Sequence, residues 1–215
     1  MSTRRTIFPT SPTMRLALLM IGVFIVEAWL LVTGQSELLL RLFALDVNHV
    51  DRVWTFVTSV FAHGNPLHLF VNLFVFISFG TTFERVYDRS FTLFFLVTGV
   101  TTGLVTILFA SVFFPSYQPI IGASGAISAM LGAMTLLYPR NRVYLFFVIP
   151  LPLWVAVTVF TIGSLVIPVV VGAGAFGIAH LAHGVGALTG VVYLVVQPPQ
   201  ERPETMPERI YSFLA

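Results

Sequence analysis

The sequence predicts an all-α membrane protein whose chain crosses the bilayer six times. Hydrophobic residues make up 57% of the 215 residues, charged residues only 9%, and the mean hydropathy is +0.93. A water-soluble domain of this length needs far more charged surface. No alternation typical of barrel strands is present, and unpaired backbone is costly in lipid, so each apolar span is expected to be a helix.

Composition also excludes several classes of function. Cysteine is absent, which removes disulfides, thiolate metal sites and a cysteine nucleophile. The formal net charge of +2 is too small to suggest a nucleic-acid partner, so the expected surroundings are the lipid bilayer.

Hydropathy places the spans near 14–33, 66–83, 91–114, 123–138, 152–170 and 176–197. The first span lacks a small-residue cleavage site followed by a soluble domain, so we expect it to be a retained helix. Pro150 and Pro152 would break a helix, which makes 143–151 an expected interfacial lead-in to the fifth span.

Composition and flanking charge predict where the membrane domain begins and ends, and on which side of the membrane the two termini lie. Residues 1–13 form the expected N-terminal segment, 14–197 the membrane domain and 198–215 a flexible tail rich in proline and charge. Nine arginines flank one side of the spans, whereas only Arg41 and Arg52 flank the other. The positive-inside rule then predicts that both termini are cytoplasmic.

Polar side chains from three spans are predicted to lie at a common depth. Ser124 precedes Tyr138 by 14 residues, and His183 precedes Gln197 by the same number. At about 1.5 Å per residue, both lie ~21 Å above the cytoplasmic boundary, with His68 at ~22 Å and Asn72 at ~16 Å. A shared layer near the outer surface is what a shared site requires.

Those residue types are suited to peptide hydrolysis. Ser124 can attack a carbonyl if the neutral imidazole of His183 takes its proton. A serine at a helix start also has free backbone N–H groups and a positive dipole end nearby, which favour an oxyanion. His68 and Asn72, four residues apart on one helix face, can donate to the same oxyanion. No Asp or Glu lies at this depth in the three spans, so we expect a Ser–His dyad.

Glycine spacing predicts close contact between the fourth and sixth spans. Gly125 and Gly132 lie seven apart, whereas Gly186 and Gly190 follow His183 by three and seven residues and share its face. Small residues let helix backbones approach closely in lipid. The blander reading is that a membrane serine bonds its own backbone, and a Gly-x-Ser-Gly string alone is weak.

At these residues the chain resembles the rhomboid family of intramembrane serine proteases, of the prokaryotic type with a six-helix core. The resemblance covers roughly Trp54 to Val196. Its motifs are the segment from His63 to Asn72 with the His-x-x-x-Asn pattern, Phe83-Glu84-Arg85, Gly122-Ala123-Ser124-Gly125, and Ala182-His183 followed by Gly186 and Gly190.

The resemblance implies Ser124 as nucleophile, His183 as general base, and His68, Asn72 and the Ser124 N–H as the oxyanion hole. It further implies an active site that opens to the extracytoplasmic side of a prokaryotic cell membrane. The expected substrates are single-pass transmembrane proteins cut in or near their membrane segment. Neither a metal nor another cofactor is expected, and the sequence does not indicate an oligomeric state.

One departure from the family motivates an alternative function. Many members carry an aromatic residue four positions after the nucleophile, where it stacks on the catalytic imidazole, but that position here is Ser128. The alternative is therefore a catalytically weak, rhomboid-like pseudoprotease that binds membrane clients without cutting them. A transporter using His63, His68 and His180 is a third hypothesis, which the lack of acidic relay residues and of an inverted repeat disfavours.

Overall fold

The computed structural model describes residues 11–87, 90–113, 119–145, 148–171, 179–199 and 208. Residues 1–10 of the predicted N-terminal segment and most of the predicted tail lie outside this part of the chain. The helices are α2 (Pro12–Val32), α3 (Ser36–Phe43), α4 (Thr55–Thr58), α5 (Pro66–Tyr87), α6 (Phe91–Phe113), α7 (Ser124–Leu137), α8 (Leu153–Val171) and α10 (Ala179–Val196), with a short 3-10 helix η1 (Val47–His49). The predicted all-α class is confirmed, apart from one small hairpin.

Each of the six predicted spans coincides with one apolar helix. Four of them, α2, α5, α6 and α8, are long and apolar enough to cross a membrane, whereas α7 and α10 are shorter apolar helices. The 14 residues of α7 extend only about 21 Å at the helical rise. The number of complete crossings therefore stays a prediction.

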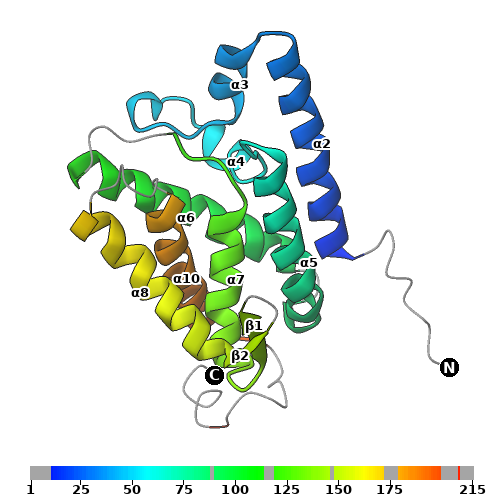
Figure 1. The fold of residues 1–215 in the computed structure, drawn as a ribbon, viewed down its shortest axis with the longest axis vertical. Helices are drawn as coiled ribbons and strands as arrows, with labels where there is room; N and C mark the ends of the chain where they lie inside the picture. The colour runs from blue at the N-terminus through cyan, green and yellow to red at the C-terminus, as the bar shows by residue number, and fades with distance from the viewer. Residues whose placement is uncertain are drawn as a thin grey trace, which may run out of the picture.

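Helix α7 lies at the centre of the bundle (Figure 1). It contacts α5, α6, α8 and α10, and its most extensive interface is with α10. Ten of its fourteen residues are buried, from Gly125 near its start to Leu137 at its end. The helix that begins with Ser124 is thus enclosed by the other apolar helices, while the outer faces of α2, α6 and α8 expose large apolar side chains suited to lipid.

Hydrogen bonds to Glu84 join the beginning of α2 to the end of α5. The Glu84 carboxylate accepts from the Ser11 hydroxyl (2.7 Å), the Thr13 backbone N–H (2.9 Å) and the Thr13 hydroxyl (2.6 Å). Gly80 leaves room for this contact, since a Cβ there would lie 2.9 Å from the Thr13 methyl group. The two helices are therefore held antiparallel at this end of the bundle.

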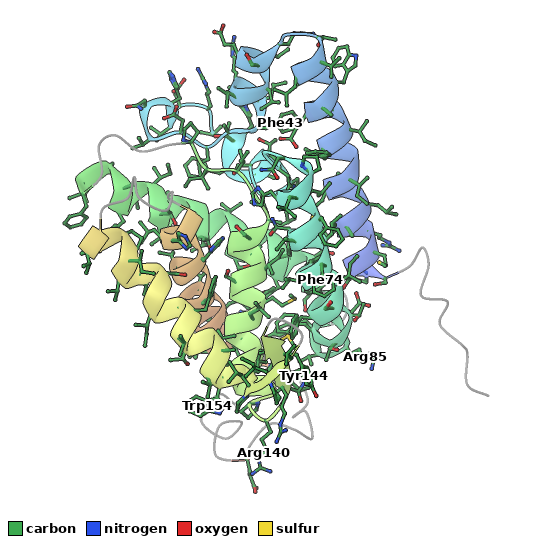
Figure 2. All side chains as sticks on the ribbon, in the orientation of Figure 1. Phe43, Phe74, Arg85, Arg140, Tyr144 and Trp154 are labelled. Carbon is green, nitrogen blue, oxygen red and sulfur yellow. The ribbon has the colours of Figure 1, made fainter. Side chains whose placement is uncertain are left out.

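A β-hairpin occupies the segment that was expected to be an interfacial lead-in. Strands β1 (Arg142–Leu145) and β2 (Ile149–Pro152) pair antiparallel, with Arg142 opposite Pro152. Proline donates no hydrogen bond to a ladder but is tolerated on an edge strand, which is what β2 is. Figure 2 shows Arg85, Arg140 and Tyr144 at the same end of the bundle, with Phe43 at the other.

Candidate active site

A cavity of about 400 Å³ lies between α5, α7, α8 and α10. Three of the four predicted site residues line it: Asn72, Ser124 and His183. Ser128 is the other polar residue of the lining, and the remaining members are apolar: Val71, Val75, Phe79, Ile127, Leu131, Val143, Leu153, Ala156, Val157 and Phe160. The predicted reacting groups therefore open into one mainly apolar space.

Hydrogen bonds to the first long loop fix the segment that leads into Ser124. Ile120 exchanges two backbone bonds with Leu45, at 2.8 and 3.0 Å, and the Gly122 N–H donates to the Ser59 carbonyl at 2.8 Å. The helix then begins at Ser124 without a side-chain cap. The first N–H groups of an α-helix have no partner within the helix, so donors are present beside the Ser124 hydroxyl.

Gly122 brings the ring of His68 close to Ser124. Its φ of +131° lies in a region that L side chains rarely adopt. A Cβ at this position would lie 2.9 Å from Cε1 and 3.0 Å from Nε2 of His68, and 3.6 Å from Ser124 Oγ. His68 Nε2 and the hydroxyl thus flank the same small volume, which only glycine leaves open.

His68 and Asn72 occupy the first two turns of α5. The Asn65 side chain accepts from the His68 backbone N–H at 2.8 Å and so caps this helix. The Asn72 amide donates to the His68 carbonyl at 3.0 Å, and Asn72 is only 6% exposed. The amide has two N–H groups, so one remains to serve the cavity.

Ring contacts surround His183. The Phe160 ring stacks on it, with centroids 5.5 Å apart and an interplanar angle of 27°, and His180 meets it edge-on at 6.0 Å. His183 Nδ1 is buried without a hydrogen-bond partner among the described residues. Phe160 was not predicted from the sequence. The signal was available in the inward stripe of α8, where Leu153, Val157 and Ser164 are buried at helical spacing from it.

Glycines bring α7 and α10 into backbone contact. A Cβ at Gly186 would overlap the Gly125 carbonyl oxygen, one at Gly190 the Ala129 carbonyl oxygen, and one at Gly132 the Ala187 carbonyl oxygen. Gly125 also faces α6, because a Cβ there would lie 2.9 Å from the Thr102 methyl group. These contacts fix the helix that carries Ser124 against the helix that carries His183.

The C-terminal ends of α5 and α10, two of the three helices along which depth was counted, lie together. The Tyr87 hydroxyl donates to the Gln197 carbonyl at 3.0 Å and so joins the ends of α5 and α10. Helix α7 contacts both of these helices. The common depth of Ser124, His183, His68 and Asn72 in a bilayer stays a prediction.

His63 lies behind His68, away from the cavity lining. The two rings meet edge-on with centroids 5.1 Å apart. The buried Glu27 carboxylate of α2 accepts the His63 backbone N–H at 2.9 Å, and His63 Nδ1 lies 3.0 Å from the Phe61 carbonyl. Burial and the neighbouring His68 lower the pKa of His63 to about 4. A neutral ring at pH 7 therefore supports His68 from behind.

Metal chemistry has no donor set in the described part of the chain, where no group of three His, Asp or Glu side chains is placed to hold an ion. What the arrangement offers is a hydroxyl, an imidazole and several N–H donors around an apolar space. That combination fits acyl transfer at a serine.

A comparison with known protein families identifies the class of membrane protein to which the chain belongs. The sequence model of the rhomboid domain matches residues 50–199, which span most of the chain. No match was found among curated proteins. The chain therefore belongs to the rhomboid family, and with its apolar helices it is an integral membrane protein.

Proposed function

We propose that the protein is an intramembrane serine endopeptidase that cleaves single-pass transmembrane proteins with a Ser124–His183 dyad. The observation that carries the proposal is the shared cavity, which Ser124, Asn72 and His183 line while the His68 ring adjoins the Gly122 α-carbon. Membership of the rhomboid family supports it.

In the proposed mechanism, His183 takes the proton of Ser124 as Oγ attacks the scissile carbonyl. The carbonyl oxygen becomes an oxyanion that accepts from His68, Asn72 and backbone N–H groups at the start of α7. His183 then returns the proton to the leaving amine. A water molecule, deprotonated by the same imidazole, hydrolyses the acyl-enzyme and releases Ser124.

Ser124→Ala and His183→Ala test the dyad. Wild-type protein in detergent should be labelled by a fluorophosphonate and should cleave a generic transmembrane substrate, whereas both variants should lose both activities. Ser111→Ala and His49→Ala are matched controls, because Ser111 bonds the Leu108 carbonyl of its own helix and His49 is exposed in the 3-10 helix η1. Labelling that persists in Ser124→Ala would assign the nucleophile elsewhere.

The alternative of a client-binding pseudoprotease was motivated only by Ser128. The Phe160 ring on His183 supplies an aromatic neighbour from another helix, which weakens that motivation. The two functions differ in one result: a pseudoprotease would retain a transmembrane client through purification without releasing cleaved product.

We also propose that both termini are cytoplasmic and that the site opens to the extracytoplasmic side of a prokaryotic cell membrane. The grouping of Arg85 and Arg140 at one end of the bundle supports this orientation (Figure 2). Because the chain has no cysteine, single-cysteine variants report topology directly. In intact cells, an impermeant maleimide should label Asp51→Cys and not Arg140→Cys, and the reverse pattern would invert the orientation.

A further inference from the structure

A base that works without a carboxylate needs another means of orientation. In a Ser–His–Asp triad, the acid fixes the tautomer and direction of the imidazole through Nδ1. Here Nδ1 of His183 has no hydrogen-bond partner among the described residues. Packing must therefore supply the orientation that a hydrogen bond supplies elsewhere.

Among the described residues, the most nearly parallel ring contact on His183 comes from α8. Phe160 lies nearly parallel to the imidazole, at 27° and 5.5 Å, whereas His180 stands almost perpendicular at 84°. Such an offset stack restricts ring rotation while leaving both nitrogens free. Phe160 is still 41% exposed, so the ring is not a buried anchor of the fold.

The neighbouring position on α7 explains why the ring comes from α8. Ser128 lines the same cavity one turn after Ser124, and a Cβ at Gly186 would lie 3.2 Å from Ser128 Cβ. Close approach of α7 and α10 thus favours a small residue at 128. The face of His183 that α7 leaves uncovered is available to a side chain from α8.

We propose that Phe160 is the positioning residue of His183, so that helix α8 sets the orientation of the general base. This inference rests on the proposed peptidase function. Because Phe160 also lines the cavity, a substrate that fills the cavity contacts the ring that holds the base. The same helix then serves both substrate contact and base alignment.

Phe160→Leu tests the proposal through a split between kcat and KM. The variant should lose roughly ten- to hundredfold in kcat, because a small misplacement of a reacting group is costly. KM should change about twofold or less, because leucine keeps an apolar side chain in contact with the substrate. Phe160→Tyr, which keeps an aromatic ring at this position, should restore most of kcat. Trp154→Leu removes an aromatic that is 52% exposed on the same helix and should leave kcat unchanged.

Two further measurements separate failure of this inference from failure of the proposed function. In wild-type protein with labelled histidine and phenylalanine, an NOE should join the ring protons of His183 and Phe160, and its absence would overturn the proposal without need of a variant. An unchanged kcat in Phe160→Leu, with normal Ser124 labelling, would overturn the positioning role alone. Absence of Ser124-dependent labelling in the wild type would overturn the peptidase function and this inference with it.

Discussion

The interface of α7 with α10 and the space between α5 and α8 are built in opposite ways. At the first, Gly186 and Gly190 bring backbone against backbone, with the Gly125 and Ala129 carbonyls in contact. At the second, side chains of α5 and α8 face each other across a cavity of about 400 Å³. Figure 1 shows α5 and α8 on opposite sides of α7.

This difference separates two requirements of the proposed protease activity. The relative position of the proposed nucleophile and base is set by backbone contact, which leaves no side chain to rearrange. Access is set by side chains around a cavity, which can move without disturbing that contact. Changes at the α7–α10 interface should therefore destroy the fold, whereas changes on the α5–α8 side should affect turnover.

Gly190→Val should have the largest effect. Its side chain would overlap the Ala129 carbonyl and push α10 away from α7. We expect a loss of about 3 kcal/mol or more in unfolding free energy, measured by denaturant titration in detergent micelles. Gly22→Val is the matched control, since nothing lies within 4 Å of a Cβ there. Equal stability of the two variants would show that the interface is adaptable.

Asn72→Ala should instead affect catalysis far more than stability. Loss of one oxyanion donor typically lowers kcat by about 10²–10³-fold, whereas the lost bond to the His68 carbonyl costs only about 1 kcal/mol. Steady-state cleavage and thermal unfolding measure the two effects. Asn48→Ala, at an exposed position of the 3-10 helix η1, is the control. An unchanged kcat would remove Asn72 from the oxyanion hole.

The sequence predicted the apolar helices of the fold. The bounds of α6 and α7 differ from expectation by one residue at most, because apolar length and flanking polar residues determine where such helices begin and end. The pairing of β1 with β2 was not predicted, since the two prolines exclude a helix but do not indicate a partner strand.

The residues of the candidate site likewise divide into those that the sequence predicts and those that only the structure brings to notice. Motif residues could be identified one by one, because each lies in a pattern within a single segment. Gly122 belongs to the motif around Ser124, and the structure adds its positive φ and its close approach to His68. Phe160 comes from a helix with no motif of its own, and its value depends on the tertiary contact with His183. Whether these residues act as proposed stays a prediction.

Cross-linking α5 to α8 tests whether the cavity between these two helices must change shape during turnover. Val75→Cys and Ala156→Cys place two thiols on opposite walls of the cavity in a chain otherwise free of cysteine. A bis-maleimide bridge should slow cleavage of a transmembrane substrate about tenfold, since such gating motions set many turnover rates. Fluorophosphonate labelling should persist because the probe is small. Each single-cysteine variant is the control, and an unaffected cleavage rate would argue against access between these helices.

Tyr87→Phe should have the smallest effect, and it tests the lower boundary that both regions share. The substitution removes the bond from the Tyr87 hydroxyl to the Gln197 carbonyl while keeping the ring among Phe83, Phe94 and Tyr193. A single neutral hydrogen bond is worth about 1 kcal/mol, so unfolding free energy should fall by roughly that amount. Tyr144→Phe, which is 61% exposed on the hairpin, should change it by less than about 0.5 kcal/mol.

Because the α7–α10 contact lies above the Tyr87–Gln197 bond and is made by backbone, kcat should stay at the wild-type value in Tyr87→Phe. A fall in kcat would mean that the depth of His183 relative to Ser124 depends on how the helix ends are tied, and the proposed division between a fixed interface and an adjustable cavity would not hold.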